Sequence, residues 1–223
     1  MGRFIVIDGL DGSGKETQSL LLKEHLEGLG YKVRYLSFPC YESDSSLFVR
    51  KYLNGELGAR PEDTNAYAAS SFFAADRYLS YRTDWKKDIE DPETVVIANR
   101  YTTANAVHQL SKLDKEQWNG FLSWLWDYEF FKLGIPMPDA VIYLEMHPDI
   151  SYRLIKSRSD STGRTIDIHE ADNGFLYKSY EAALYASDRL NWTRICCYEN
   201  GEPLSRKEIS EQIISSLGYG KNA

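Results

Sequence analysis

The chain has 223 residues, of which 43% are hydrophobic and 26% charged, so it is long enough for one large domain with a substantial core. Its net charge of −7 argues against a partner with a phosphate backbone, because nucleic acids select basic faces. No apolar run approaches the ~20 residues of a membrane span, and no apolar signal segment precedes the first predicted strand. Three cysteines form neither a disulfide framework nor a metal spacing. We therefore expect a cytoplasmic protein that binds neither nucleic acid nor a membrane.

The first predicted unit is residues 4–18, FIVIDGLDGSGKETQ, a strand followed by a glycine-rich turn and a helix. The spacing Gly9-x4-Gly14-Lys15 in this setting indicates a phosphate-binding P-loop over residues 9–17. Its glycines let backbone N–H groups point inward, the helix N-terminus adds free donors, and Lys15 supplies a positive charge. We expect the donor phosphates to be held by Gly9, Leu10, Asp11, Gly12, Ser13, Gly14, Lys15, Glu16 and Thr17.

Two residues of this loop carry unexpected charges. Glu16 stands where the pattern places the Ser or Thr that ligates Mg²⁺. A carboxylate at Asp11 would repel donor phosphates unless it faces elsewhere, which suggests contact with a second substrate. The alternative for Asp11 is a local preference of Asp for turns.

The rest of the chain alternates predicted strands and helices. Strands are predicted at residues 31–38, 94–98, 140–144 and 193–198. Helices are predicted at residues 47–53, 61–81, 101–110 and 114–132, after Pro148, at residues 172–188, and from Pro203 to about Gly218. The polar stretch 157–170 reads as a mobile lid. This alternation predicts a single α/β domain over residues 1–223, whose parallel sheet is covered on both faces and binds ligands at the carboxyl ends of its strands.

Three further groups are candidates for the site. Arg100 directly follows a buried strand, where it is well placed to hold an acceptor phosphate. Phe73 and Arg77 are four residues apart on one helix face, where a ring stacks a base and a guanidinium reaches the base edge, although such stripes also form cores. Arg158 and Arg164 in the lid would stabilise a transferring phosphoryl group, unless the loop is merely solvated.

The order and spacing of several segments resemble the thymidylate kinase family over nearly the whole chain. These segments are FIVIDGLDGSGKETQ, Phe38-Pro39, FFAADRY, NRYTTANAVHQ and GIPMPDAVIYLEMHPD. The resemblance implies a P-loop NTPase fold with a five-stranded parallel sheet, and transfer of the ATP γ-phosphoryl group to dTMP to give dTDP in dTTP synthesis. It also implies Mg²⁺ as cofactor and a homodimer.

The resemblance also assigns roles to residues. It places Lys15 on the donor phosphates and Asp11 near the acceptor sugar and phosphate. It gives the remaining dTMP-binding positions as Phe38, Phe73 for the thymine ring, Arg77 for the base edge, Arg100 for the acceptor phosphate, Asn105 for the base, and His108 against the sugar 2′ position. Gly12 stands where some relatives carry a catalytic arginine, which leaves Arg158 and Arg164 as candidates for that role.

Three positions depart from the family pattern. Glu16 replaces a hydroxyl residue, Asn99 replaces an aspartate, and Tyr41 replaces an arginine that follows Phe-Pro in many relatives. We hypothesise that the first two are one change, in which the carboxylate near Mg²⁺ moves from position 99 to Glu16 and Asn99 becomes a weak ligand.

Alternative functions remain beside this one. They are a kinase for another nucleoside monophosphate or a deoxynucleoside, and an inactive relative that binds nucleotide without transfer. A GTPase switch is disfavoured because the sequence has no Asn-Lys-x-Asp motif.

Overall fold

The computed structural model describes residues 2–162 and 173–220. A five-stranded sheet lies at its centre, with the strand order β2-β3-β1-β4-β5 and all neighbouring pairs parallel. Its strands are β1 (Arg3–Gly9), β2 (Lys32–Ser37), β3 (Thr94–Asn99), β4 (Ala140–Glu145) and β5 (Thr193–Cys196). The P-loop NTPase arrangement and the five-stranded parallel sheet predicted from the sequence are confirmed.

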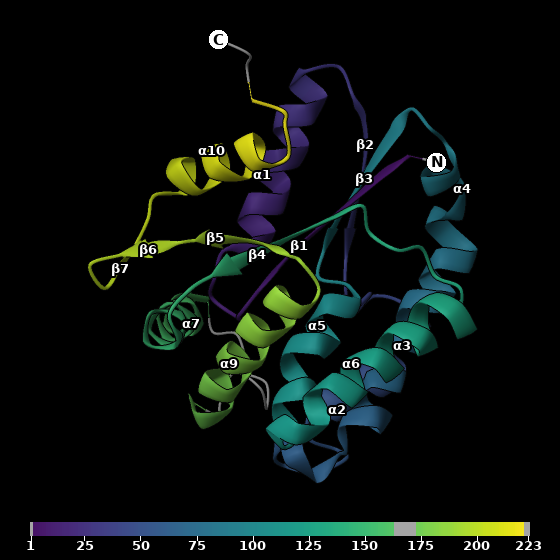
Figure 1. Ribbon diagram of the computed structural model, residues 1–223, viewed down its shortest axis with the longest axis vertical. Coiled ribbons are helices and arrows are strands. Elements are labelled where there is room, and N and C mark those ends of the chain that lie inside the picture. The colour runs from purple at the N-terminus through teal and green to yellow at the C-terminus, as the bar shows by residue number, and fades with distance from the viewer. Residues whose placement is uncertain (1, 163–172, 221–223) are drawn as a thin grey trace.

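Helices cover both faces of this sheet (Figure 1). The described helices are α1 (Lys15–Gly28), α2 (Leu47–Leu53), α3 (Ala66–Ser80), α4 (Lys86–Glu90), α5 (Thr102–His108), α6 (Trp118–Trp126), α7 (Pro148–Thr162), α9 (Asn173–Arg189) and α10 (Arg206–Ser216). Among the described residues, none of these helices is long and apolar enough to cross a membrane.

The two faces of the sheet bury separate apolar clusters. Ile5 and Ile7 of β1 point toward α1 and α10, where they meet Leu22 and Ile213. Phe4 on the same strand points to the opposite face, toward α5, α6 and α9. Successive side chains of a strand alternate between faces, so an unbroken apolar run is what a sheet covered on both sides requires.

The carboxyl ends of β1 and β3 lie side by side because these strands are parallel neighbours in register, with Ile7 opposite Asn99. The turn after β1 and the residues after β3 therefore meet at one edge of the sheet, which is where doubly wound sheets bind ligands. Gly12 has φ +81°, and a Cβ there would lie 2.7 Å from the Ser151 carbonyl oxygen, so both conformation and space favour glycine.

Three predicted elements differ from the structure. Pro61 opens only a short 3₁₀ turn, Pro61–Asp63, because Thr64 is extended. The helix α3 begins later, at Ala66, where the Asn65 side chain accepts a hydrogen bond from the Ala68 N–H. Pro203 pairs with Tyr198 in the small hairpin of β6 (Tyr198–Glu199) and β7 (Glu202–Pro203), and α10 is capped instead by Ser205.

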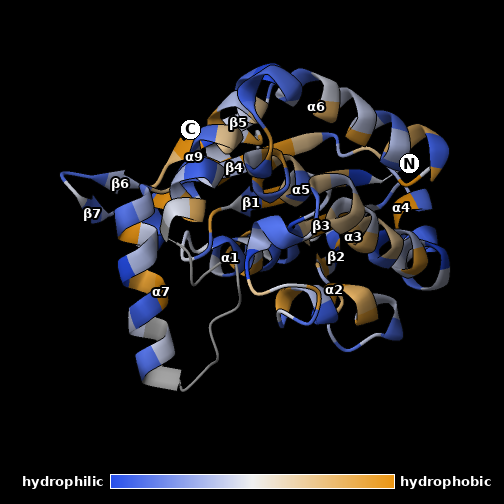
Figure 2. Ribbon diagram, turned by 90° about the horizontal axis from the view of Figure 1, so that it is seen from below, coloured by the Kyte–Doolittle hydropathy of each residue, from blue (hydrophilic) through white to orange (hydrophobic). Residues whose placement is uncertain are grey.

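The prediction of a lid over residues 157–170 is wrong for its first six residues. Residues 157–162 continue α7, which extends away from the sheet (Figure 2). The rest of the predicted lid, residues 163–170, lies outside the described residues.

Candidate functional site

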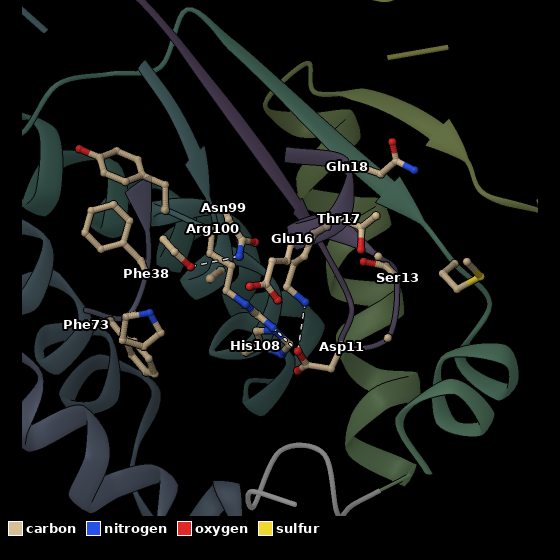
Figure 3. A pocket seen from close by; sticks show the side chains of 18 of the residues that line it. Asp11, Ser13, Glu16, Thr17, Gln18, Phe38, Phe73, Asn99, Arg100 and His108 are labelled. Carbon is tan, nitrogen blue, oxygen red and sulfur yellow. Dashed lines mark hydrogen bonds and ion pairs between the residues drawn. The ribbon is translucent and has the colours of Figure 1, made fainter. Parts of the chain in front are cut away.

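A cavity of about 860 Å³ lies at the carboxyl edge of the sheet. Figure 3 shows Phe38 and Phe73 on one side of it, Ser13, Thr17 and Gln18 on the other, and Arg100 between them. Segments far apart in the sequence therefore share one space. The predicted site residues that line it are Asp11, Gly12, Ser13, Gly14, Lys15, Glu16, Thr17, Phe38, Phe73, Arg77, Asn99, Arg100, Asn105 and His108.

Lys15 is folded back over the glycine-rich turn. Its Nζ donates to the Leu10 carbonyl oxygen at 3.1 Å and to the Asp11 carboxylate at 3.1 Å. Gly14 caps α1 in the left-handed conformation, with φ 83°, and carries no side chain that would occupy the free N–H groups of the first turn. The helix N-terminus and the ammonium group thus face the same part of the cavity, as phosphate binding requires.

Arg100 turns toward the P-loop through an unusual backbone conformation. Its φ is 66°, in the left-handed region that residues with a Cβ seldom adopt and that costs about 1–3 kcal/mol. The Arg100 N–H donates to the Ile7 carbonyl at 3.0 Å, which fixes the turn to β1. From there the guanidinium reaches Asp11 with Nη2 and lies 2.9 Å from the His108 Nε2 with Nη1.

Asp11 is therefore the carboxylate that two cations share (Figure 3). Burial by itself would raise the pKa of Asp11, but Arg100 and Lys15 outweigh it and hold the pKa well below its usual value. Burial lowers the pKa of Lys15, and the neighbouring Arg100 charge lowers it further. The Asp11 carboxylate therefore contacts Arg100 and the P-loop Lys15 through the same oxygen, at the point where the two elements meet.

The other side of the cavity combines an aromatic ring with polar side chains. Phe73 packs edge-on against Tyr52, with ring centroids 6.1 Å apart. Arg77 lies one turn further along α3 and is almost fully buried. Its guanidinium is bound by Glu129 at 2.7 Å through Nε and at 2.6 Å through Nη2, so it approaches the cavity in one fixed orientation.

His108 lies where the cavity meets α9. Its ring stacks on Phe175 with centroids 6.1 Å apart and an angle of 18° between the planes. The Arg100 guanidinium can only donate, so His108 Nε2 is the acceptor in this contact. The His108 ring thus lines the cavity between Arg100 and α9.

The residues proposed for Mg²⁺ are oxygen ligands that line the cavity. Asn99 donates through Nδ2 to the Ser37 Oγ at 3.1 Å, and its Oδ1 is buried without a hydrogen-bond partner. The exposed Glu16 carboxylate lies nearby (Figure 3). Within the described ranges, no group of three or more His, Cys, Asp and Glu could hold a metal by itself. This set fits Mg²⁺, which is usually bound by one or two protein oxygens together with substrate phosphates.

Four predicted site residues do not line the cavity as described. Gly9 and Leu10 lie beneath the loop, where Leu10 belongs to the core and contributes only its carbonyl oxygen to Lys15. Arg158 belongs to α7, but its side chain is outside the described part of the chain, as is the whole of Arg164.

The cavity also holds residues that sequence reasoning missed. Arg50 lines it and donates from Nη1 to the carbonyl oxygens of Tyr41 and Ser43, at 2.7 and 2.8 Å. Arg206 at the start of α10 lines the cavity near Gln18, whose side-chain amide donates to the Arg206 carbonyl oxygen at 3.0 Å. Its place after the last strand, at the edge where ligands bind, was a signal that could have found it. Sequence reasoning also missed Glu129, which does not line the cavity but binds Arg77; nothing in the local sequence indicates this contact.

Comparison with known proteins places this site in a family context. The sequence model described as thymidylate kinase matches residues 7–197. A curated thymidylate kinase from Mycobacterium tuberculosis is 29% identical over 170 residues, which span 75% of this chain and 78% of that protein. A probable thymidylate kinase from Thermococcus gammatolerans is 33% identical over 168 residues, 73% of this chain and 74% of that protein.

A solved thymidylate kinase from Candida albicans has a similar fold. The two structures superpose with a TM-score of 0.68 at 19% sequence identity, covering 98% of this chain and 93% of the other. This similarity supports the architecture of the sheet and its covering helices.

Proposed function

The chain belongs to the thymidylate kinase family, and we propose from the described site how it performs that family's reaction. It is a nucleoside monophosphate kinase that phosphorylates dTMP to dTDP with ATP as donor. The γ-phosphoryl group leaves the ADP oxygen and joins an oxygen of the dTMP phosphate. Phosphoryl transfer needs little covalent help from a protein, so catalysis depends on positioning and on charge stabilisation.

One observation carries the assignment of roles: Lys15 and Arg100 reach the same Asp11 carboxylate from different elements. Lys15 and the N–H groups at the start of α1 suit the donor triphosphate. Arg100 suits the acceptor phosphate, since a guanidinium forms charge-assisted hydrogen bonds with phosphate oxygens. Because Asp11 lies between the two cations, donor and acceptor phosphates bound to them would be neighbours, as in-line transfer requires.

The acceptor nucleoside would occupy the side of the cavity lined by Phe73, Arg77, Asn105 and His108. Phe73 would stack the thymine ring, and Arg77 and Asn105 would read its edge. The His108 ring would crowd a ribose 2′-hydroxyl and favour deoxyribose. Phe38, which is buried at the end of β2, would support this side from below.

Mg²⁺ would be held by Glu16, with Asn99 as a weaker ligand, together with the phosphates of ATP. Bound there, the ion would neutralise charge on the donor phosphates. Arg158, near the end of α7, and Arg164, beyond it in the sequence, are proposed to stabilise charge on the transferring group.

A coupled assay with Mg²⁺ and ATP tests the proposal on dTMP, dUMP, dCMP and thymidine. We expect dTDP formation from dTMP as the fastest reaction, and its near-complete loss in Lys15→Met, which removes the charge at similar side-chain length. Turnover of another monophosphate in preference to dTMP would change the substrate assignment. ATP binding without any dTDP formation would identify an inactive relative.

The assembly and location of the protein are also proposals. The family resemblance supports a homodimer, and the acidic composition supports a cytoplasmic enzyme that binds no nucleic acid and no membrane. Light scattering of the purified protein at micromolar concentration would distinguish a dimer from a monomer.

A further inference from the structure

Glu129 lies in a π-helical segment, Asp127–Lys132, that follows α6, and its side chain has no exposure to solvent. It is absent from the cavity lining. Its two oxygens accept four hydrogen bonds from side chains: Arg77 Nε at 2.7 Å, Arg77 Nη2 at 2.6 Å, Thr102 Oγ1 at 2.8 Å and Asn105 Nδ2 at 3.0 Å. Two of these donors, Arg77 and Asn105, line the acceptor side of the cavity.

These contacts fix which way the Asn105 amide faces. Its Nδ2 donates to Glu129 Oε1 at 3.0 Å and to the Ser70 carbonyl oxygen at 3.2 Å. Both partners can only accept, so the amino end of the amide must face them. The Oδ1 atom is therefore at the other end, and Asn105 can present only an acceptor to a ligand in the cavity.

The same carboxylate limits what Arg77 offers. A guanidinium has five N–H groups and no acceptor. Glu129 takes two of them, and the Tyr101 carbonyl oxygen takes one from Nη1 at 3.2 Å. One N–H group remains on Nη1 and one on Nη2, so Arg77 presents only donors to the cavity. The cavity is therefore lined by a cationic donor, the Arg77 guanidinium, and by a neutral acceptor, the Asn105 Oδ1.

This pair matches one class of pyrimidine. Thymine and uracil present an acceptor at O4 and a donor at N3–H, whereas cytosine presents a donor at N4 and an acceptor at N3. We propose that Glu129 is a positioning residue for base selection: by fixing Arg77 as donor and Asn105 as acceptor, it favours 4-keto pyrimidines over cytosine without touching the substrate. The inference rests on the proposed acceptor site and adds the residue that sets its polarity.

Glu129→Gln tests this directly, because it keeps the side-chain shape but gives the residue an amide that can donate. The Asn105 amide is then free to turn and to present a donor. We expect the ratio of kcat/KM for dTMP to kcat/KM for dCMP to fall about 10- to 100-fold, the range for losing one charge-assisted hydrogen bond. The KM for ATP should stay within about twofold, since the hydrogen bonds of the Glu129 side chain go to Arg77, Thr102 and Asn105 and not to the P-loop.

Two other variants separate positioning from stability. Thr102→Val removes one hydrogen bond to Glu129 but leaves the contacts with Arg77 and Asn105, so it should lower Tm without changing the substrate ratio. Glu129→Asp keeps an acceptor-only carboxylate and should retain more of the ratio than Glu129→Gln. A Glu129→Gln ratio within twofold of the unaltered chain, with Tm lowered, would show a purely structural role and overturn the inference.

A second variant and a binding measurement complete the test. Should Glu129→Gln not fold, Asn105→Ala removes the presented Oδ1 directly and must lower the same ratio; an unchanged ratio there also overturns the inference. Calorimetric titration of dTMP and dCMP measures the selection without turnover. If the unaltered chain forms no dTDP, the proposed function fails, while the binding ratio still decides the role of Glu129.

Discussion

Lys112 offers a sharp test of the packing beside α2, because it is a partly buried lysine. It lies in a 3₁₀ turn, Leu110–Lys112, and its Nζ donates to the Tyr52 hydroxyl at 2.7 Å and to the Thr64 carbonyl oxygen at 3.0 Å. Burial lowers the pKa of Lys112 from 10.5 to about 7, and the Glu62 charge offsets this only in part. Lys112→Met keeps the apolar stem and removes the titrating group.

The sign of the pH dependence follows from proton binding. Between about pH 7 and pH 10 the unfolded chain keeps the Lys112 proton and the folded chain has lost it, so the free energy of unfolding rises with pH. One pKa unit corresponds to about 1.4 kcal/mol, so this group contributes a rise of about 2 kcal/mol between pH 7 and pH 9. Below about pH 7 both states are protonated, and the contribution stops changing.

The assay is urea unfolding of both proteins at several pH values from about 7 to 9. Other groups titrate equally in both, so the difference between the unaltered chain and Lys112→Met isolates Lys112. That difference should grow by about 2 kcal/mol in favour of the unaltered chain as pH rises. Lys207→Met, at a side chain that is 84% exposed, is the matched control and should show no such trend. Parallel curves for Lys112→Met and the unaltered chain would refute the reasoning.

Three further predictions about the site can be checked by steady-state kinetics. Arg100→Gln should lower kcat/KM for dTMP by about 100-fold or more, because it removes the charge on the acceptor phosphate, while KM for ATP changes little. An equal rise in both KM values would contradict its placement. Glu16→Ala should lose Mg²⁺-dependent turnover far more than Asn99→Ala; equal, small effects would remove the carboxylate-transfer hypothesis. Phe73→Ala should raise KM for dTMP about 10- to 100-fold through lost stacking. Phe72→Ala, which removes a ring that stacks on Phe48 and is absent from the cavity lining, should not.

Local order was readable from the sequence where short-range chemistry decides it. The glycine spacing of the P-loop, the unbroken apolar run of β3 and the short helix α2 all depend on residues within one turn or strand of each other. The predicted bounds of α2, residues 47–53, match those observed. Parallel strands then place the ends of β1 and β3 at one edge, so Lys15 and Arg100 could be expected to meet.

The prediction was wrong at two helix starts, both of which it had placed at a proline. Pro61 and Pro203 both suit a first helical position, yet the helices begin at Ala66 and Arg206. At both sites a side chain that accepts a hydrogen bond from the helix, Asn65 or Ser205, defines the start. Which of several competing local signals prevails depends on where packing lets the helix end lie.

What only the tertiary structure decided is how charges are shared. Asp11 and Arg100 are 89 residues apart and Arg77 and Glu129 are 52 apart, and no local pattern links either pair. The sequence by itself determined which site groups the chain carries and their order along it. They are a phosphate-binding loop, a helix with an aromatic residue and an arginine on one face, and an arginine after a buried strand. The buried carboxylates that orient those groups emerge only on folding, because a charge removed from water must find its partner wherever the chain brings one close.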